Sequence, residues 1–199
     1  MPNHSVLLIF IRNPELGKVK TRLAETVGDE MALKIYMALM AHTRELALQL
    51  PVDRWLFYSH FIDKQDNWEN EKFSKKLQTQ GDLGVKMQVA FQAACAQYQK
   101  VMIIGSDCAS LTPQIIQEGF DALDQHSFVL GPAIDGGYYL LGMRQFTPSL
   151  FQHIPWSTAQ VAELTLAEME RLGGTCYLLP TLSDIDYAED WEAYGWEVT

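Results

Sequence analysis

The stretch 101–108, Val-Met-Ile-Ile-Gly-Ser-Asp-Cys, decides the fold that we expect for this chain. Its first four residues are apolar, which is the pattern of a strand buried on both faces of a sheet. Asp107 therefore stands where a buried strand reaches the surface, and Thr112-Pro113 has the residues that open a helix. In open α/β sheets the ligand crevice lies at the carboxyl ends of the strands, so we expect Asp107 to face a ligand. The structural alternative is that Asp107 only caps the next turn.

Strands and helices alternate on both sides of this stretch. Further strands are expected over 6–11, 54–59, 77–80, 128–132 and 175–179, and helices over 28–50, 85–99, 113–123 and 158–172. Such alternation favours the α/β class, with three layers: a mostly parallel central sheet and helices on both of its faces. The length of 199 residues is near the prior for one domain, so we expect a single domain over 1–199.

Composition narrows the classes of function. The formal net charge of -10 argues against binding to nucleic acid or to an anionic membrane surface. No apolar run has the length that a membrane span requires, so we expect no membrane insertion. The three cysteines are far apart and odd in number, which indicates neither a disulfide framework nor a metal-binding cluster and favours a cytoplasmic location. The sequence does not predict an oligomeric state.

A basic loop follows the first expected strand. Arg12, Lys18, Lys20 and Arg22 lie within eleven residues of an otherwise acidic protein, and Gly17 among them is typical of a loop. A loop in this position is well placed to receive phosphates, which the forked donors of Arg and the point charge of Lys both suit. The alternative is a solvated charged turn. The loop has neither the Walker A spacing nor the glycine spacing of dinucleotide-binding proteins.

Two glycine-containing segments stand at further strand ends. Gly81 and Gly84 lie at a strand-to-helix junction, where glycines would allow a ligand close to the backbone, although a plain turn explains them equally well. Asp135 is followed by two glycines and places a second acid at a second expected strand end. Asp-Gly-Gly is also a good turn by itself.

Acidic residues recur near the end of the chain. Asp184 and Asp186 alternate with Ile185, so the two carboxylates would share one side of an extended segment. An acid such as Asp107 at a strand end can hold a divalent cation, and oxygen-rich sites suit Mg²⁺ or Mn²⁺. We therefore expect one of these two divalent ions as a cofactor at Asp107.

Six motifs occur in order between Phe10 and Trp191. They are Arg-x-Pro-x-x-Gly-x-Val-Lys-Thr-Arg-Leu at 12–23, Gly-Asp-Leu-Gly at 81–84, Gly-Ser-Asp-Cys at 105–108, Asp-Gly-Gly-Tyr-Tyr-Leu at 135–140, Pro-Trp-Ser-Thr at 155–158 and Asp-Ile-Asp-x-x-Glu-Asp at 184–190. In this combination the chain resembles the radical-SAM/selenodomain-associated glycosyltransferases, which have the nucleotide-diphospho-sugar transferase, or glycosyltransferase-A-like, fold. It is more distantly similar to molybdenum-cofactor guanylyltransferase, 2-phospho-lactate guanylyltransferase and the sugar-acid cytidylyltransferases.

The resemblance, together with these patterns, implies a role for each matching residue. Expected to bind the nucleotide and its phosphates are Arg12, Gly17, Lys20, Arg22, Gly81 and Gly84. We expect Asp107 and Asp186 to hold the metal. We expect Lys20, Asp107 and Asp135 to act in catalysis. Expected to contact the substrate are Gly136, Gly137, Trp156 and Ser157.

The reaction stays open between two transfers. Arg12-Asn13-Pro14 replaces the Gly-rich turn of nucleotidyltransferases, and Ser106-Asp107-Cys108 has one acid where glycosyltransferases have Asp-x-Asp. The first expectation is metal-dependent glycosyl transfer from a nucleotide-diphospho-sugar to an unknown small acceptor. The alternative is nucleotidyl transfer from a nucleoside triphosphate to a phosphorylated or carboxylate acceptor with release of pyrophosphate, which four basic residues suit better. A third hypothesis, nucleotide binding without catalysis, is disfavoured because binding alone needs fewer acids.

Overall fold

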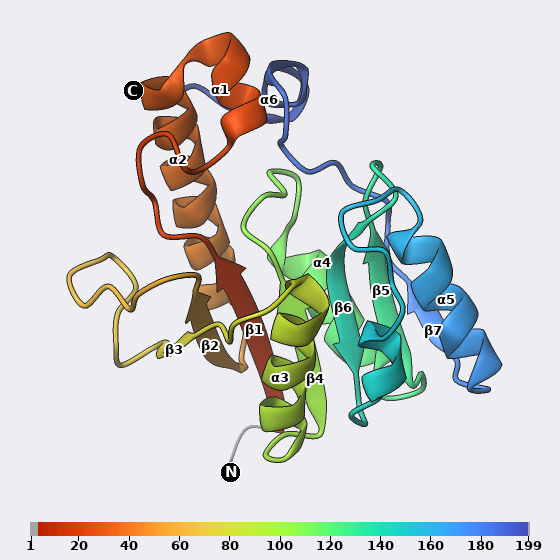
Figure 1. Cartoon of the computed structure of the whole chain (residues 1–199). Helices are drawn as coiled ribbons and strands as arrows, with labels where there is room; N and C mark the ends of the chain where they lie inside the picture. Colours follow the sequence, from red (N-terminus) through yellow and green to blue (C-terminus); the bar gives the residue numbers. More distant parts are fainter. Residues whose placement is uncertain (1–3, 199) are drawn as a thin grey trace.

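The computed structural model describes residues 4–198, and within them seven strands form one sheet in the order β3-β2-β1-β4-β6-β5-β7 (Figure 1). The strands are β1 (Ser5–Ile11), β2 (Asp53–Tyr58), β3 (Ser74–Leu77), β4 (Lys100–Ile104), β5 (Phe128–Pro132), β6 (Tyr138–Met143) and β7 (Cys176–Leu178). β6 runs antiparallel to β4 and β5, whereas the other neighbouring strands are parallel. The predicted α/β fold with a mostly parallel sheet is confirmed.

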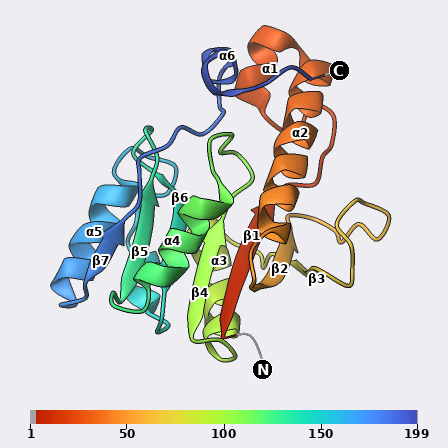
Figure 2. The ribbon, with the colours of Figure 1, turned by 180° about the vertical axis from the view of Figure 1, so that it is seen from behind.

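Helices cover both faces of this sheet. They are α1 (Thr21–Val27), α2 (Asp29–Leu48), α3 (Leu83–Cys95), α4 (Pro113–Ala122), α5 (Val161–Arg171), α6 (Ala188–Tyr194) and the 3-10 helix η1 (Pro148–Phe151). Figure 1 shows α3 and α5 in front of the sheet, and Figure 2 shows α2 and α4 on the other face. The result is the predicted three-layer arrangement. No helix of the described residues is long and apolar enough to cross a bilayer.

The two cores follow from the alternation of side chains along each strand. In β1, Leu7 and Ile9 pack with residues of α2 and α4, whereas Val6 and Leu8 pack with residues of α3, η1 and α5. All four are fully buried. Burying one such side chain contributes about 1.5–3 kcal/mol, so the central strands are fixed in register on both faces.

A third apolar cluster lies beyond the carboxyl ends of β1 and β4. It joins Leu23 of α1 and Leu39 of α2 to Ile185, which precedes α6, and to Ala188, its first residue. The backbone N–H of Ile185 donates to the carbonyl oxygen of Asp107 at 2.9 Å. This cluster returns the C-terminal segment to the strand ends, as the upper part of Figure 1 shows.

Three details differ from the expected elements. The loop after the first strand ends at Lys20, because 21–27 forms α1 and buries Leu23. β3 spans Ser74–Leu77 rather than 77–80, and this polar segment gives a weak strand pattern because β3 is a partly exposed edge strand. Helix α6 was not predicted. The expectation of a single domain over 1–199 stays a prediction.

Candidate functional site

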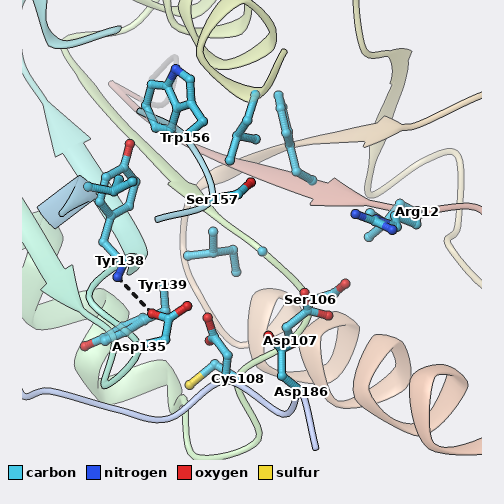
Figure 3. A pocket seen from close by; sticks show the side chains of 18 of the residues that line it. Arg12, Ser106, Asp107, Cys108, Asp135, Tyr138, Tyr139, Trp156, Ser157 and Asp186 are labelled. Atoms are coloured by element: carbon cyan, nitrogen blue, oxygen red, sulfur yellow. Dashed lines mark hydrogen bonds between the residues drawn. The ribbon is translucent and has the colours of Figure 1, made fainter. Parts of the chain in front are cut away.

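A cavity of about 860 Å³ opens at the carboxyl ends of β1 and β4 (Figure 3). Its walls come from the loops after these strands, the start of α3, the turn before β6, the segment 156–161 and the C-terminal segment. The volume lies within the range of pockets that hold small molecules and cofactors. The position is the crevice expected for ligands of open α/β sheets.

Most of the predicted site residues line this cavity. They are Arg12, Lys20, Arg22, Gly81, Asp107, Asp135, Gly137, Trp156, Ser157 and Asp186. Figure 3 shows Trp156 on the opposite side of the cavity from Asp107 and Asp186. Gly17, Gly84 and Gly136 are not among the lining residues. The structure thus brings together segments that are far apart in the sequence, while the function of each residue stays a prediction.

Lys20 is the centre of a charge network in this cavity. Its Nζ lies 2.9 Å from Oδ1 of Asp107 and 3.6 Å from Oδ1 of Asp186, and Arg22 Nη1 donates to Oδ2 of Asp186 at 3.1 Å. The Lys20 side chain is 6% exposed, against 44% for Asp107 and 38% for Asp186. The acids expected to hold a metal are therefore paired with the bases expected to hold phosphates.

The backbone of Lys20 is left-handed, with φ 49° and ψ 46° at the start of α1. This region costs a residue with a Cβ roughly 1–2 kcal/mol. Ser157, which also lines the cavity, has φ 65°. Non-glycine residues held in this way cluster at functional sites, because the surroundings must over-determine them.

Asp184 is a cavity residue to which the sequence analysis assigned no role. The pKa of its carboxyl is raised to about 7, chiefly by burial and also by repulsion from Asp107 and, more weakly, from Asp135 and Asp186, while Lys20 opposes the shift. The only signal in the sequence was its alternation with Asp186. Three other carboxylates thus repel the charged form of Asp184 in this cavity, and a bound cation would relieve that repulsion.

Tyr36 of α2 ties the ends of β1 and β4 together. Its hydroxyl donates to the carbonyl oxygen of Arg12 at 3.0 Å, accepts from the Arg12 backbone N–H at 2.8 Å and lies 3.3 Å from Ser106 Oγ. Burial raises the pKa of Tyr36, which keeps the hydroxyl neutral. Tyr36 therefore fixes the basic loop relative to Asp107, a role that helical periodicity could not reveal.

The basic residues at the cavity also differ from the predicted cluster. Lys18 is 66% exposed, pairs with Glu15 at 2.7 Å and does not line the cavity. Lys86 of α3 does line it. A search limited to the loop could not find Lys86, because its contribution depends on how α3 packs.

The acids fit a hard divalent cation that shares its shell with a substrate. Among residues 4–198, no group of three or more His, Cys, Asp or Glu side chains is arranged to hold an ion. Asp107 and Asp186 offer an oxygen pair, and Mg²⁺ is usually bound through one or two carboxylates, with substrate phosphates and waters as the remaining ligands. The donor set therefore fits Mg²⁺ or Mn²⁺ brought with a phosphate.

Two of the predicted glycines serve the packing of the cavity wall. A Cβ on Gly84 would lie 2.3 Å from Nε1 of Trp156, so this glycine lets the indole approach α3. Gly136 has φ +88°, and its Cβ would lie 2.2 Å from the carbonyl oxygen of Ala159. In place of a ligand, the space beside each glycine holds another part of the chain.

Gly84→Ala should therefore displace Trp156 and lower the free energy of unfolding by about 1–3 kcal/mol, the usual cost of overpacking. Urea unfolding measures the loss, and quenching of tryptophan fluorescence reports the exposure of the indole. Gly105→Ala is the control, because its Cβ would meet no atom within 4 Å. Equal losses in the two variants would contradict the packing role of Gly84.

Comparisons with known proteins agree with this architecture. Residues 42–158 match the family described as "Uncharacterized protein conserved in bacteria (DUF2064)". A search of curated proteins found no match. The crystal structure of a "putative nucleotide-diphospho-sugar transferase" from Desulfovibrio desulfuricans G20 is 32% identical, covers 93% of this chain and 83% of its own, and has a TM-score of 0.84.

Two more distant structures share the fold alone. The inositol-1-phosphate CTP transferase from T. maritima is 11% identical with a TM-score of 0.60, over 98% of this chain and 94% of its own. Rv0371C from Mycobacterium tuberculosis H37Rv, solved as a complex with manganese, is 12% identical with a TM-score of 0.52, over 98% of each chain. This chain belongs to the DUF2064 family and has the nucleotide-diphospho-sugar transferase fold.

Proposed function

We propose that this protein is a metal-dependent transferase acting on an activated nucleotide, and that its reaction is glycosyl transfer from a nucleotide-diphospho-sugar to a small acceptor. The observation that carries the proposal is the pairing of Lys20 and Arg22 with Asp107 and Asp186 in one cavity. The name of the Desulfovibrio relative and the resemblance to the radical-SAM/selenodomain-associated glycosyltransferases support the same reaction.

The charges of the cavity suit a diphosphate that carries a cation. Lys20, Arg22 and Lys86 would bind phosphate oxygens, since charge-assisted hydrogen bonds to phosphate are among the strongest that proteins make. Asp107 and Asp186 would hold Mg²⁺ or Mn²⁺. When bound, the cation would supply charge neutralisation for the leaving diphosphate.

Asp135 is the candidate base for the acceptor. Its Oδ1 accepts a hydrogen bond from the Gly137 backbone N–H at 2.8 Å, which holds the carboxylate at the cavity wall (Figure 3). An acceptor hydroxyl oxygen would attack the anomeric carbon as the bond from that carbon to the diphosphate oxygen breaks. The hydroxyl proton would pass to Asp135, as in general base catalysis. Trp156 would offer an apolar face to the sugar ring.

Nucleotidyl transfer is the second candidate, because four basic residues line the cavity even though Lys18 lies outside it. They are Arg12, Lys20, Arg22 and Lys86. Four positively charged side chains suit a triphosphate better than a diphosphate. A phosphate or carboxylate oxygen of the acceptor would then attack the α-phosphorus, and pyrophosphate would leave. The fold shared with the inositol-1-phosphate CTP transferase is compatible with this reaction.

The released product separates the two reactions. The protein is incubated with each nucleotide sugar or nucleoside triphosphate, Mn²⁺ and a panel of small acceptors, and the product is identified by mass spectrometry. A nucleoside diphosphate released only with an acceptor supports glycosyl transfer, whereas pyrophosphate supports nucleotidyl transfer. If no nucleotide binds in a thermal-shift screen with metal, both proposals are wrong.

Arg22→Ala tests the phosphate role in the same assay. The loss of one charge-assisted contact should weaken nucleotide-sugar binding by roughly tenfold to a hundredfold, while the melting temperature stays near that of the parent protein. Lys18→Ala is the matched control, since Lys18 lies in the same segment but outside the cavity. Normal binding by a folded Arg22→Ala protein would show that Arg22 does not contact the ligand.

A further inference from the structure

We infer that Lys20 couples metal binding to phosphate binding, because it must leave Asp107 and Asp186 before a cation can reach both carboxylates. The inference rests on the proposed function and adds a prediction about the protein's own residues. In the structure one buried ammonium stands between the two acids, 2.9 Å from one and 3.6 Å from the other. A divalent cation bound by both carboxylates would need the same place.

Lys20 is the buried member of this charge network, and the two carboxylates are the exposed members. The Lys20 side chain is 6% exposed, whereas both carboxylates have more than a third of their surface in solvent. A desolvated ammonium needs its negative partners more than hydrated carboxylates need a positive one. Lys20 therefore holds the acids until another anion takes their place beside it.

A phosphate is such an anion, and the geometry allows the exchange. Arg22 Nη1 lies 3.1 Å from Oδ2 of Asp186, so Lys20 and Arg22 are both paired with acids. When a diphosphate enters, Lys20 and Arg22 can transfer to its oxygens and free Asp107 and Asp186 for the cation. Every charge keeps an opposite partner before and after the exchange, and neither ligand completes it alone.

The two lysines of the basic loop have different partners. Lys20 is the N-cap residue of α1, with φ 49°, and its ammonium reaches Asp107 after the end of β4 at 2.9 Å. Lys18, two residues earlier, pairs with Glu15 instead. The pair Lys20 and Lys18 therefore offers a test residue and a control within one loop.

The experiment compares the parent protein with Lys20→Met, Lys20→Gln and Lys18→Met in two titrations. One measures the affinity for MnCl₂ alone, by electron paramagnetic resonance of free Mn²⁺. The other measures the affinity for inorganic pyrophosphate alone in EDTA, by calorimetry. Removing the ammonium should tighten Mn²⁺ binding and weaken pyrophosphate binding, each by roughly 5- to 150-fold, the usual range of coupling between two sites. Lys18→Met should change neither affinity.

Opposite signs are the signature of the inference, because a structural role for Lys20 would weaken both ligands together. Unchanged or weaker Mn²⁺ binding in folded Lys20→Met and Lys20→Gln proteins would overturn it, and so would unchanged pyrophosphate binding. The proposed function survives that result if the parent protein still binds a nucleotide with Mn²⁺. If the parent binds neither pyrophosphate nor any nucleotide with Mn²⁺, the proposed function fails, and the inference fails with it.

Discussion

Asp107→Asn should lower the metal-dependent transferase activity by roughly two to three orders of magnitude while the protein stays folded. Asparagine keeps the shape of the side chain, but it removes the charge that would hold a cation against the leaving phosphate. Losses of this size follow the removal of one preorganised electrostatic group from an active site. The value of kcat/KM with the nucleotide substrate and Mg²⁺ measures the effect, and the melting temperature verifies the fold.

The other end of the same strand supplies a matched control. Lys100 at the start of β4 pairs with Asp124 at 2.7 Å, whereas Asp107 after the end of β4 pairs with Lys20 at 2.9 Å. Asp124→Asn breaks a similar ion pair far from the cavity and should leave the activity unchanged. A folded Asp107→Asn protein with the activity of the parent would rule out the metal role of Asp107.

The strand ends could be predicted because the information is local. In an α/β protein, an apolar run such as Val101–Ile104, followed by a polar residue and a helix cap, predicts a buried strand that ends before a helix. The cap is present in the structure, where Thr112 Oγ1 accepts from the Ile115 N–H at 3.3 Å. Such local patterns predicted the order of the layers and the edge of the sheet that carries the cavity.

The pairing inside the cavity could not be predicted, because it depends on contacts between distant segments. Asp186 meets Arg22 across 164 positions of sequence, and the strand pattern gives no signal for this contact. The packing of Trp156 against Gly84 could not be predicted for the same reason. In the sequence, a glycine that makes room for an indole cannot be distinguished from one that makes room for a ligand. Burial also gave Asp184 its raised pKa, which its spacing from Asp186 did not predict.

Asp184→Asn should stabilise the protein at alkaline pH and leave its stability nearly unchanged near pH 4. The pKa of the Asp184 carboxyl is about 7 in the folded protein, against an ordinary value of 3.8. Below pH 4 the carboxyl is protonated in both the folded and the unfolded chain, so it does not affect the balance between them. Between about pH 4 and pH 7 the unfolded chain releases the proton while the folded chain retains it. The contribution of this carboxyl to the free energy of unfolding of the parent protein therefore falls across this window.

Asparagine carries no charge at any pH and should abolish that loss. Above pH 7 the variant should be more stable than the parent by about 1–4 kcal/mol, since each unit of pKa shift is worth roughly 1.4 kcal/mol and the full shift is an upper limit. Urea unfolding at pH 4 and pH 8 in EDTA, which keeps cations off the carboxylates, gives the difference. Asp121→Asn is the control, because Asp121 is an exposed residue of α4 outside the cavity. A difference between Asp184→Asn and the parent that is the same at both pH values would contradict the raised pKa. A gain confined to high pH would show that the folded chain holds this carboxylate at a cost, as expected for a group kept among other acids to serve a site rather than stability.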